Sequence, residues 1–266
     1  LLRSAAVASS LGRADVAARC ASSAARMAAA IRKHMIDGNG FAASYPRQAH
    51  TRPALADNAY LLWSGLLDAD EAGALAAKLL SPELSPIDTP FHALFVAEGL
   101  FDHGTADDAL AFIRSYFGSM LDRGATTFWE HFHQADPPGL INSSSLCHGW
   151  SAGPVYSLPA HVLGVRPLEP GFARILIEPR HGGLPWAKGC VPTPHGLCSV
   201  NWTRNDGEFH LSVNIPEGCT ARVSLPALGT HETLCIDGAP VAPHRAGNKI
   251  HCDVPAGRHG IVHTRQ

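Results

Sequence analysis

The sequence has 266 residues, of which 45% are apolar and 17% are charged, and its formal net charge is −2. This length supports one large domain or two ordinary ones with real hydrophobic cores. The near-neutral charge and the lack of a Lys/Arg run argue against a nucleic acid or an anionic membrane as partner. No apolar stretch approaches the roughly 18 residues of a transmembrane helix, so we expect none.

The chain opens at Leu1-Leu2-Arg3-Ser4, without an initiator Met or a signal peptide. We therefore expect a fragment, or a chain that starts inside a longer protein, and its compartment stays undecided. The seven cysteines form no C-x-x-C pair and have no His at zinc spacing, and the sixteen histidines are scattered. We expect most of the cysteines to be small buried hydrophobes, and no metal or cofactor.

The first part of the chain, residues 1–163, is predicted to be helical. Alanine, the best helix former, is dense in 5–30, and Gly12 marks a joint between two helices. The second of these, 14–36, stops at the breaker cluster 37–40. Further helices are predicted at 55–67, 71–80, 90–102, 105–121 and 148–162. Because the breaks between them are short and rich in Gly, Pro and Asp, we expect antiparallel helical hairpins.

From Gly164 onward, residues 164–266 are predicted to be an antiparallel β-sandwich. Gly and Pro become frequent, helical periodicity ends, and short β-rich runs follow at intervals typical of a sandwich. The runs are 174–177, 197–202, 208–215, 220–225, 233–236 and 249–252. Asn205-Asp206-Gly207 predicts a hairpin turn between two of them.

Candidate catalytic chemistry is concentrated in 123–150. Glu130 follows Trp129 in a loop after a predicted helix, where functional residues concentrate. A carboxylate of this kind suits the general base of an inverting glycosidase, and Trp129 would wall the sugar site and keep the carboxylate partly dry. The alternative interpretation of Glu130 is a solvated residue at a helix N-terminus.

His148 and Trp150 are the other candidates in this segment. His148 would hydrogen-bond a sugar hydroxyl, or else be a core histidine bonded to backbone, and Trp150 would stack on a sugar or pack in the core. Elsewhere, the stripe formed by Tyr60, Trp63 and Leu67 is typical of a core face. The run Asp88-Thr89-Pro90-Phe91 predicts a helix start with Pro90 as its first residue.

Four segments, read together in their order, resemble a known family. They are ATTFWE at 125–130, SLCHGWSAGP at 145–154, VLGVRPLEPGF at 162–172 and VPTPHG at 191–196. The chain resembles the C-terminal part of bacterial α-L-rhamnosidases of the glycoside hydrolase family 78 type, which invert configuration without a cofactor. The resemblance is best over 86–225 and implies the second half of a six-hairpin (α/α)6 barrel followed by a β-sandwich.

The resemblance also implies residue roles. Glu130, in the TT-x-W-E motif, matches the general base that activates water, and His148, in the C-H-G-W motif, matches a histidine that contacts rhamnose. Trp129 and Trp150 are substrate-binding candidates beside them. The expected fold class is therefore a multidomain α and β chain: a partial (α/α)6 toroid and then an antiparallel β-sandwich.

The sequence departs from the family in what it lacks. The family's general acid lies in an earlier Asp/Glu-rich segment that nothing here resembles, and only about half of the twelve barrel helices are predicted. We expect the N-terminal part of the same polypeptide to complete the site, and the 266-residue chain alone to be inactive on its rhamnose-containing glycoside. The alternatives are a six-hairpin glycosidase for another sugar and a non-catalytic carbohydrate-binding module.

Overall fold

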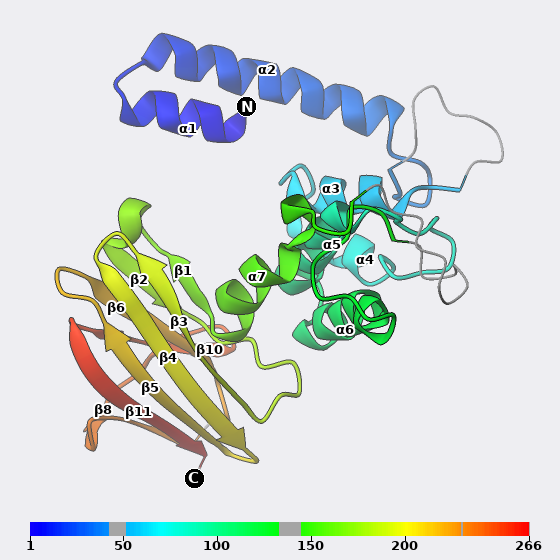
Figure 1. Ribbon diagram of the computed structural model, residues 1–266. Helices are drawn as coiled ribbons and strands as arrows, with labels where there is room; N and C mark the ends of the chain where they lie inside the picture. The colour runs from blue at the N-terminus through cyan, green and yellow to red at the C-terminus, as the bar shows by residue number, and fades with distance from the viewer. Residues whose placement is uncertain (43–51, 133–144, 230, 266) are drawn as a thin grey trace.

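The computed structural model describes residues 1–42, 52–132, 145–229 and 231–265, and it consists of a helical part followed by two β-sheets (Figure 1). The last helical segment ends at Val162 and the first strand begins at Val165. The expected fold class, helical hairpins followed by a β-sandwich, is confirmed. Within the described residues, no helix is both long enough and apolar enough to span a membrane.

Consecutive helices pack as hairpins, with α1 against α2 and α5 against α6. The helices of this part are α1 (Leu2–Ser10), α2 (Ala14–His34), α3 (Leu55–Trp63), α4 (Ala69–Ala76), α5 (Pro90–His103) and α6 (Ala106–Asp122). Helix α5 is central, because it contacts α3, α4 and α6. Gly99 in α5 allows α3 to approach closely, since a Cβ at this position would lie 3.0 Å from Cδ1 of Leu62.

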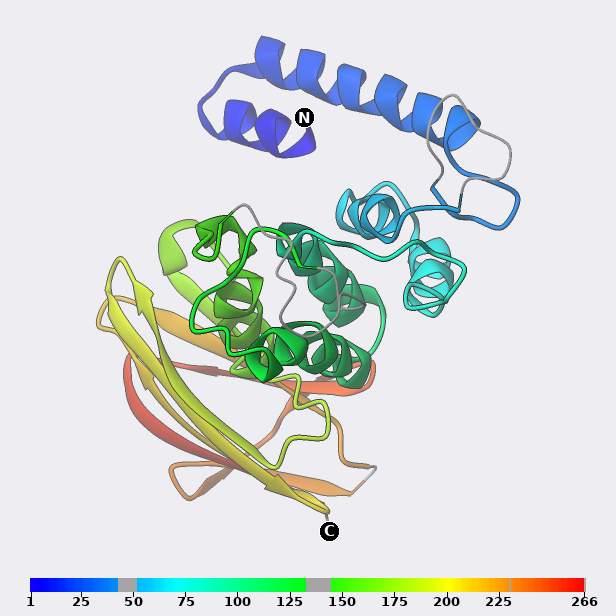
Figure 2. The same cartoon turned by 45° about the vertical axis from the view of Figure 1, so that its right-hand side comes forward.

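The α1–α2 hairpin stands apart from the other helices in both views (Figures 1 and 2). None of the 21 residues of α2 is buried. Ile31 packs against the apolar core, and the rest of the attachment of α2 is polar. The Arg32 guanidinium donates to both Glu71 carboxylate oxygens, at 2.7 and 2.8 Å, and to the Leu66 carbonyl at 2.7 Å. The apolar helical core instead lies among α3, α4, α5 and α6.

The stretch predicted as one helix over 148–162 is broken into three short turns. They are the 3-10 turn η1 (Gly149–Ser151), α7 (Gly153–Ser157) and the π-helical turn η2 (Leu158–Val162). Pro154 and Pro159 have no N–H to donate, so a regular α-helical ladder cannot continue through them. The wider hydrogen bond from the Leu163 N–H to the Leu158 carbonyl, 3.1 Å, closes the last turn.

The C-terminal part contains two packed sheets. The first has the strand order β1-β2-β6-β10-β9 and the second β3-β4-β5-β11-β7-β8. The bounds are β1 (Val165–Pro167), β2 (Arg174–Ile177), β3 (Trp186–Thr193), β4 (Gly196–Asn205), β5 (Glu208–Ile215), β6 (Thr220–Pro226), β7 (Glu232–Ile236), β8 (Ala239–Val241), β9 (His244–Ala246), β10 (Lys249–Val254) and β11 (Gly257–Arg265). Pairing is antiparallel except between β2 and β6, which run parallel.

The residue types within each strand explain why the sequence predicted some strands and missed others. Along β5, exposed and buried residues alternate almost without interruption, and the Asp206-Gly207 turn joins β4 to β5 as predicted. The sequence did not indicate β3 or β11, because each contains glycine and β3 also contains Pro192. Both residue types are uncommon inside strands.

The cysteines differ from expectation. All seven are free thiols, but only Cys198 and Cys219 are buried, so the prediction that most are buried is wrong. Burial raises the pKa of the Cys198 thiol to about 11. This thiol is therefore a protonated part of the sandwich core at neutral pH.

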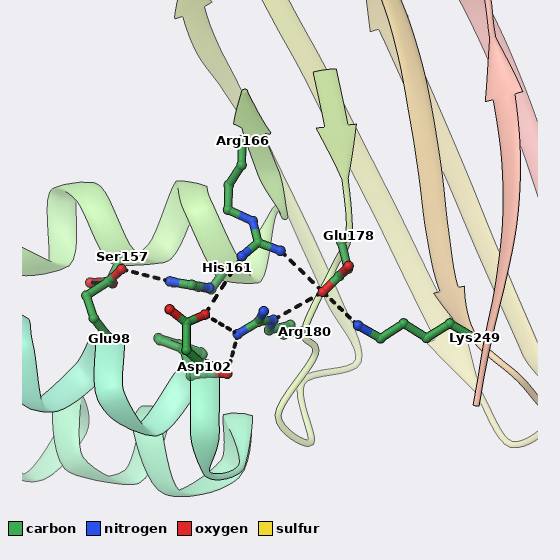
Figure 3. Close-up of polar contacts among 9 residues, drawn as sticks. Glu98, Asp102, Ser157, His161, Arg166, Glu178, Arg180 and Lys249 are labelled. Atoms are coloured by element: carbon green, nitrogen blue, oxygen red, sulfur yellow. Dashed lines mark hydrogen bonds and ion pairs between the residues drawn. The ribbon is translucent and has the colours of Figure 1, made fainter. Parts of the chain in front are cut away.

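A network of charges joins the helices to the sandwich (Figure 3). Glu178, just after β2, accepts from Arg166 at 3.2 Å, Arg180 at 3.4 Å and Lys249 at 3.0 Å. Arg180 also donates to Asp102 of α5 at 3.1 Å. Burial opposes ionisation of Glu178, yet the three cations outweigh it and lower the pKa of this carboxyl.

Beside this network, buried contacts hold the end of the helical part together and join it to the sandwich. Glu98 of α5 accepts from the Ser157 hydroxyl at 2.8 Å and lies 3.1 Å from Nε2 of His161, whose ring stacks on Phe101. The indole N–H of Trp202 in β4 donates to the Val162 carbonyl at 2.9 Å. The helices and the sandwich therefore pack as one continuous core.

Candidate active site

The loop after α6 carries Glu130 and lies beside the segment that carries His148. The Glu130 N–H donates to the Ser145 carbonyl at 2.9 Å, and the His148 N–H donates to the Phe128 carbonyl at 2.8 Å. These two backbone hydrogen bonds join 128–130 to 145–148. The tertiary structure thus brings together two motifs that are separated in sequence.

A second set of contacts anchors this loop to the start of α5. The Phe132 N–H donates to the Asp88 carbonyl at 2.5 Å, and the Thr89 hydroxyl lies 3.3 Å from Nδ1 of His131. The Tyr116 hydroxyl of α6 donates to the Phe132 carbonyl at 3.3 Å. Glu130 is therefore held between two backbone anchors, Phe128 on one side and Phe132 on the other.

Trp129 lies in the core behind the loop. Its side chain is 4% exposed and meets the Phe132 ring at 5.7 Å and 67°. It supports the backbone that carries Glu130 but presents little surface to a ligand. Glu130 itself is half-buried, and its backbone is fixed by the bond to Ser145.

Trp150 is 73% exposed, so it does not pack in the core, as one interpretation of the sequence predicted. Its ring lies 6.1 Å from that of His148 and 5.6 Å from that of Phe91, at the start of α5. A large apolar ring at an exposed position is available for contact with a ligand. Trp150, His148 and Phe91 therefore form one end of an aromatic surface.

The aromatic surface continues along α5 to α3. Phe95 contacts the rings of Phe91 at 5.5 Å, Tyr60 at 4.4 Å and Trp63 at 5.2 Å. The Tyr60 hydroxyl lies 2.9 Å from Nδ1 of His92. Trp63 is 46% exposed, so the stripe that the sequence indicated as core is only partly covered.

The sequence indicated only a helix start at Phe91 and His92, and not their place in this aromatic surface. The structure confirms Pro90 as the first residue of α5. The signal in the sequence is the aromatic pair Phe91-His92 directly after Pro90. In the structure, this pair in α5 lies next to Tyr60 and Trp150. Among residues 1–42, 52–132, 145–229 and 231–265, no group of three or more His, Cys, Asp or Glu side chains has the geometry of a metal site.

Two family models match the chain. Residues 1–162 match the bacterial alpha-L-rhamnosidase six-hairpin glycosidase domain, and residues 164–233 match the bacterial alpha-L-rhamnosidase C-terminal domain. Among curated proteins, an alpha-L-rhamnosidase of Streptomyces avermitilis is 30% identical over 115 residues, and one of Alteromonas sp. is 32% identical over 120 residues. Each alignment covers 42% of this chain, but only 11% and 13% of those proteins.

Solved structures share the fold. The alpha-L-rhamnosidase from Dictyoglumus thermophilum matches with a TM-score of 0.81 and 20% identity, over 98% of this chain and 30% of that one. The Streptomyces avermitilis alpha-L-rhamnosidase complexed with L-rhamnose matches with a TM-score of 0.80 and 22% identity, over 97% and 25%. The chain thus spans under a third of these relatives. It belongs to the bacterial alpha-L-rhamnosidase six-hairpin glycosidase family.

Proposed function

We propose that this chain is part of an inverting α-L-rhamnosidase and that Glu130 is its general base. The observation that supports the proposal is the pair of backbone hydrogen bonds between 128–130 and 145–148, which brings the segment of Glu130 next to the segment of His148. The names of the relatives support rhamnose as the sugar, as does the rhamnose complex of the Streptomyces avermitilis enzyme. The substrate is then a glycoside with a terminal α-L-rhamnose.

The chemistry follows from the needs of an inverting mechanism. A carboxylate general base removes a proton from water while that water attacks the anomeric carbon from the face opposite the leaving group. The position of Glu130 suits this role, because the residue is only half-buried and its loop is fixed at Phe128 and Phe132. His148 would donate to a sugar hydroxyl, and Trp150 would cover an apolar face of the ring. This hydrolysis needs no cofactor.

The general acid is proposed to come from another part of the polypeptide. The proposal rests on the short span of this chain relative to its relatives and on the lack of an Asp/Glu-rich segment that resembles the acid motif. The uncovered surface of α2 supports the same view, because a helix hairpin in a barrel normally packs against a neighbour. The 266-residue chain alone is then expected not to hydrolyse rhamnosides.

The test is Glu130→Gln in a longer parent protein that contains the rest of the barrel. Loss of the base should lower kcat by about 10²–10⁴-fold, while the neutral amide keeps the shape needed for rhamnose binding. Glu217→Gln, in an exposed turn of the sandwich, is the matched control and should leave kcat unchanged. Near-normal turnover of the Glu130 variant would overturn the assignment.

Two further assays separate the alternatives. A panel of nitrophenyl glycosides with the parent protein should give turnover with α-L-rhamnoside, and turnover with another sugar alone would indicate a different six-hairpin glycosidase. Calorimetric titration of the 266-residue chain with rhamnose addresses the non-catalytic alternative. Tight rhamnose binding together with an inactive parent would favour a carbohydrate-binding module.

A further inference from the structure

The outer face of the sheet formed by β3, β4, β5 and β11 carries short polar side chains instead of apolar ones. In β4 and β5 the buried positions are apolar, whereas the alternate, outward positions include Ser199, Asn201, Ser212 and Asn214. Because side chains alternate between the two faces of a strand, these four residues share one surface. A sheet that needed only solubility would more commonly carry long charged residues there.

The strand register aligns these side chains into two adjacent rows. Lys188 pairs with Asn201, which pairs with Ser212, which pairs with Gly260 of β11. Directly opposite residues in such pairs have Cβ atoms ~4.5–5.5 Å apart. Hydrogen-bonding groups therefore recur at a regular spacing across the sheet, on a rigid support.

The neighbouring row has the same construction. Cys190 pairs with Ser199, Ser199 with Asn214, and Asn214 with Arg258. The Cys190 thiol and the Ser199 hydroxyl lie 3.3 Å apart. The two rows thus begin at Lys188 and Cys190 on β3 and end at Gly260 and Arg258 on β11.

The two rows line a groove of about 560 Å³, which Asp237 borders at the β11 side. The Asp237 carboxylate already accepts from the Gly260 N–H and lies 2.8 Å from Nδ1 of His259. By contrast, the side chains of Lys188 and Arg258 form no hydrogen bond or ion pair with any other described residue. The same holds for the side chains of Asn201, Ser212 and Asn214.

Charge and length limit what this groove can hold. Its unengaged charges are two cations, Lys188 on β3 and Arg258 on β11. They are three strand spacings apart across the sheet and two residues apart along it, which is ~16 Å in all. Complementary charge favours an anionic ligand, and the separation requires an extended one. Trp186, 62% exposed and on the same face as Lys188, adds an apolar ring at the edge.

We propose that this groove binds an acidic oligosaccharide, a sugar chain that carries carboxylates. Amide and hydroxyl side chains on a rigid sheet suit the closely spaced hydroxyls of such a chain. Lys188 and Arg258 pair with its carboxylates, and the Trp186 ring packs against one sugar face. This site lies on the sandwich, apart from Glu130, and does not depend on the proposed hydrolysis.

The test is calorimetric titration of the 266-residue chain with oligogalacturonate and with the methyl ester of the same oligomer. The ester keeps the sugar chain and removes the charge. We expect the acid form to bind more tightly, and 0.5 M NaCl to weaken that form selectively. No binding of either oligomer, or equal binding of both, overturns the proposal.

Three variants locate the site. Lys188→Met and Arg258→Gln should each weaken the acid form about two- to fivefold, the range typical of one exposed ion pair, and leave the ester unaffected. Trp186→Ala should weaken both forms. Lys33→Met on the exposed surface of α2 removes the same charge elsewhere and should change neither.

Two results would contradict the assignment even if binding is seen. Equal losses in Lys188→Met and Lys33→Met would indicate attraction to overall charge instead of a groove. Binding of inorganic polyphosphate as tight as that of oligogalacturonate would indicate a general polyanion surface. Melting temperatures within a degree or two of the parent chain establish that each variant is folded.

Discussion

The sandwich and the α1–α2 hairpin bury their apolar residues very differently. Trp202 in β4 is fully buried, whereas Met27 in α2 is 55% exposed and no residue of α2 is buried. In a sandwich the chain supplies both layers, so each inner sheet face finds its partner within the sequence. A barrel hairpin buries its surface against neighbouring hairpins. The difference shows that the sandwich buries its apolar residues within this chain, whereas α2 leaves its own exposed or half-buried.

The largest effect that tests this contrast is expected from Trp202→Ala. The change removes a large buried ring, its stacking on Phe209 and its hydrogen bond to Val162, and it should destabilise the chain by about 3–5 kcal/mol. Urea unfolding followed by circular dichroism measures this. Met27→Ala, on the hairpin, should stay within about 0.5 kcal/mol. Similar losses in both variants would refute the contrast.

An intermediate effect is expected where the two parts meet. Glu178→Gln leaves Arg166, Arg180 and Lys249 without their shared carboxylate and should cost about 1–3 kcal/mol. It should also separate the unfolding of the helices from that of the sandwich, seen as two transitions in calorimetry. Glu169→Gln, which breaks only an exposed pair with Arg174, is the control and should preserve a single transition.

The smallest effect concerns the polar attachment of the hairpin. The Arg32 guanidinium, helped by the Asp68 N–H, holds the pKa of Glu71 at about 2. Because this folded pKa lies below the ordinary value of about 4.5, the contribution of Glu71 to stability is present above pH ~4.5 and disappears as pH falls toward 2. Arg32→Gln should raise the Glu71 pKa but leave it below 4.5, because the Asp68 bond remains. Carboxyl NMR titration measures this, and an unchanged pKa would rule out the contact.

Much of the local structure could be predicted because it depends on neighbouring residues. A few adjacent residues were enough to predict the helix start at Pro90, the turn at Asp206-Gly207 and the alternation along 208–215. The candidate site could be predicted only in part. Glu130 and His148 were indicated by their motifs, but the surface formed by Phe91 and His92 was not, because aromatic residues have the same pattern in a core and in a binding site.

The sequence by itself determined the division into a helical part and a β part, the family and the motifs that carry Glu130 and His148. Only the tertiary structure decided that 128–130 pairs with 145–148, that Trp129 is buried while Trp150 is exposed, and that β2 runs parallel to β6. The physical reason is the distance along the sequence over which each effect acts. Periodicity and turn chemistry act over a few residues, whereas burial depends on which distant segment supplies the partner surface.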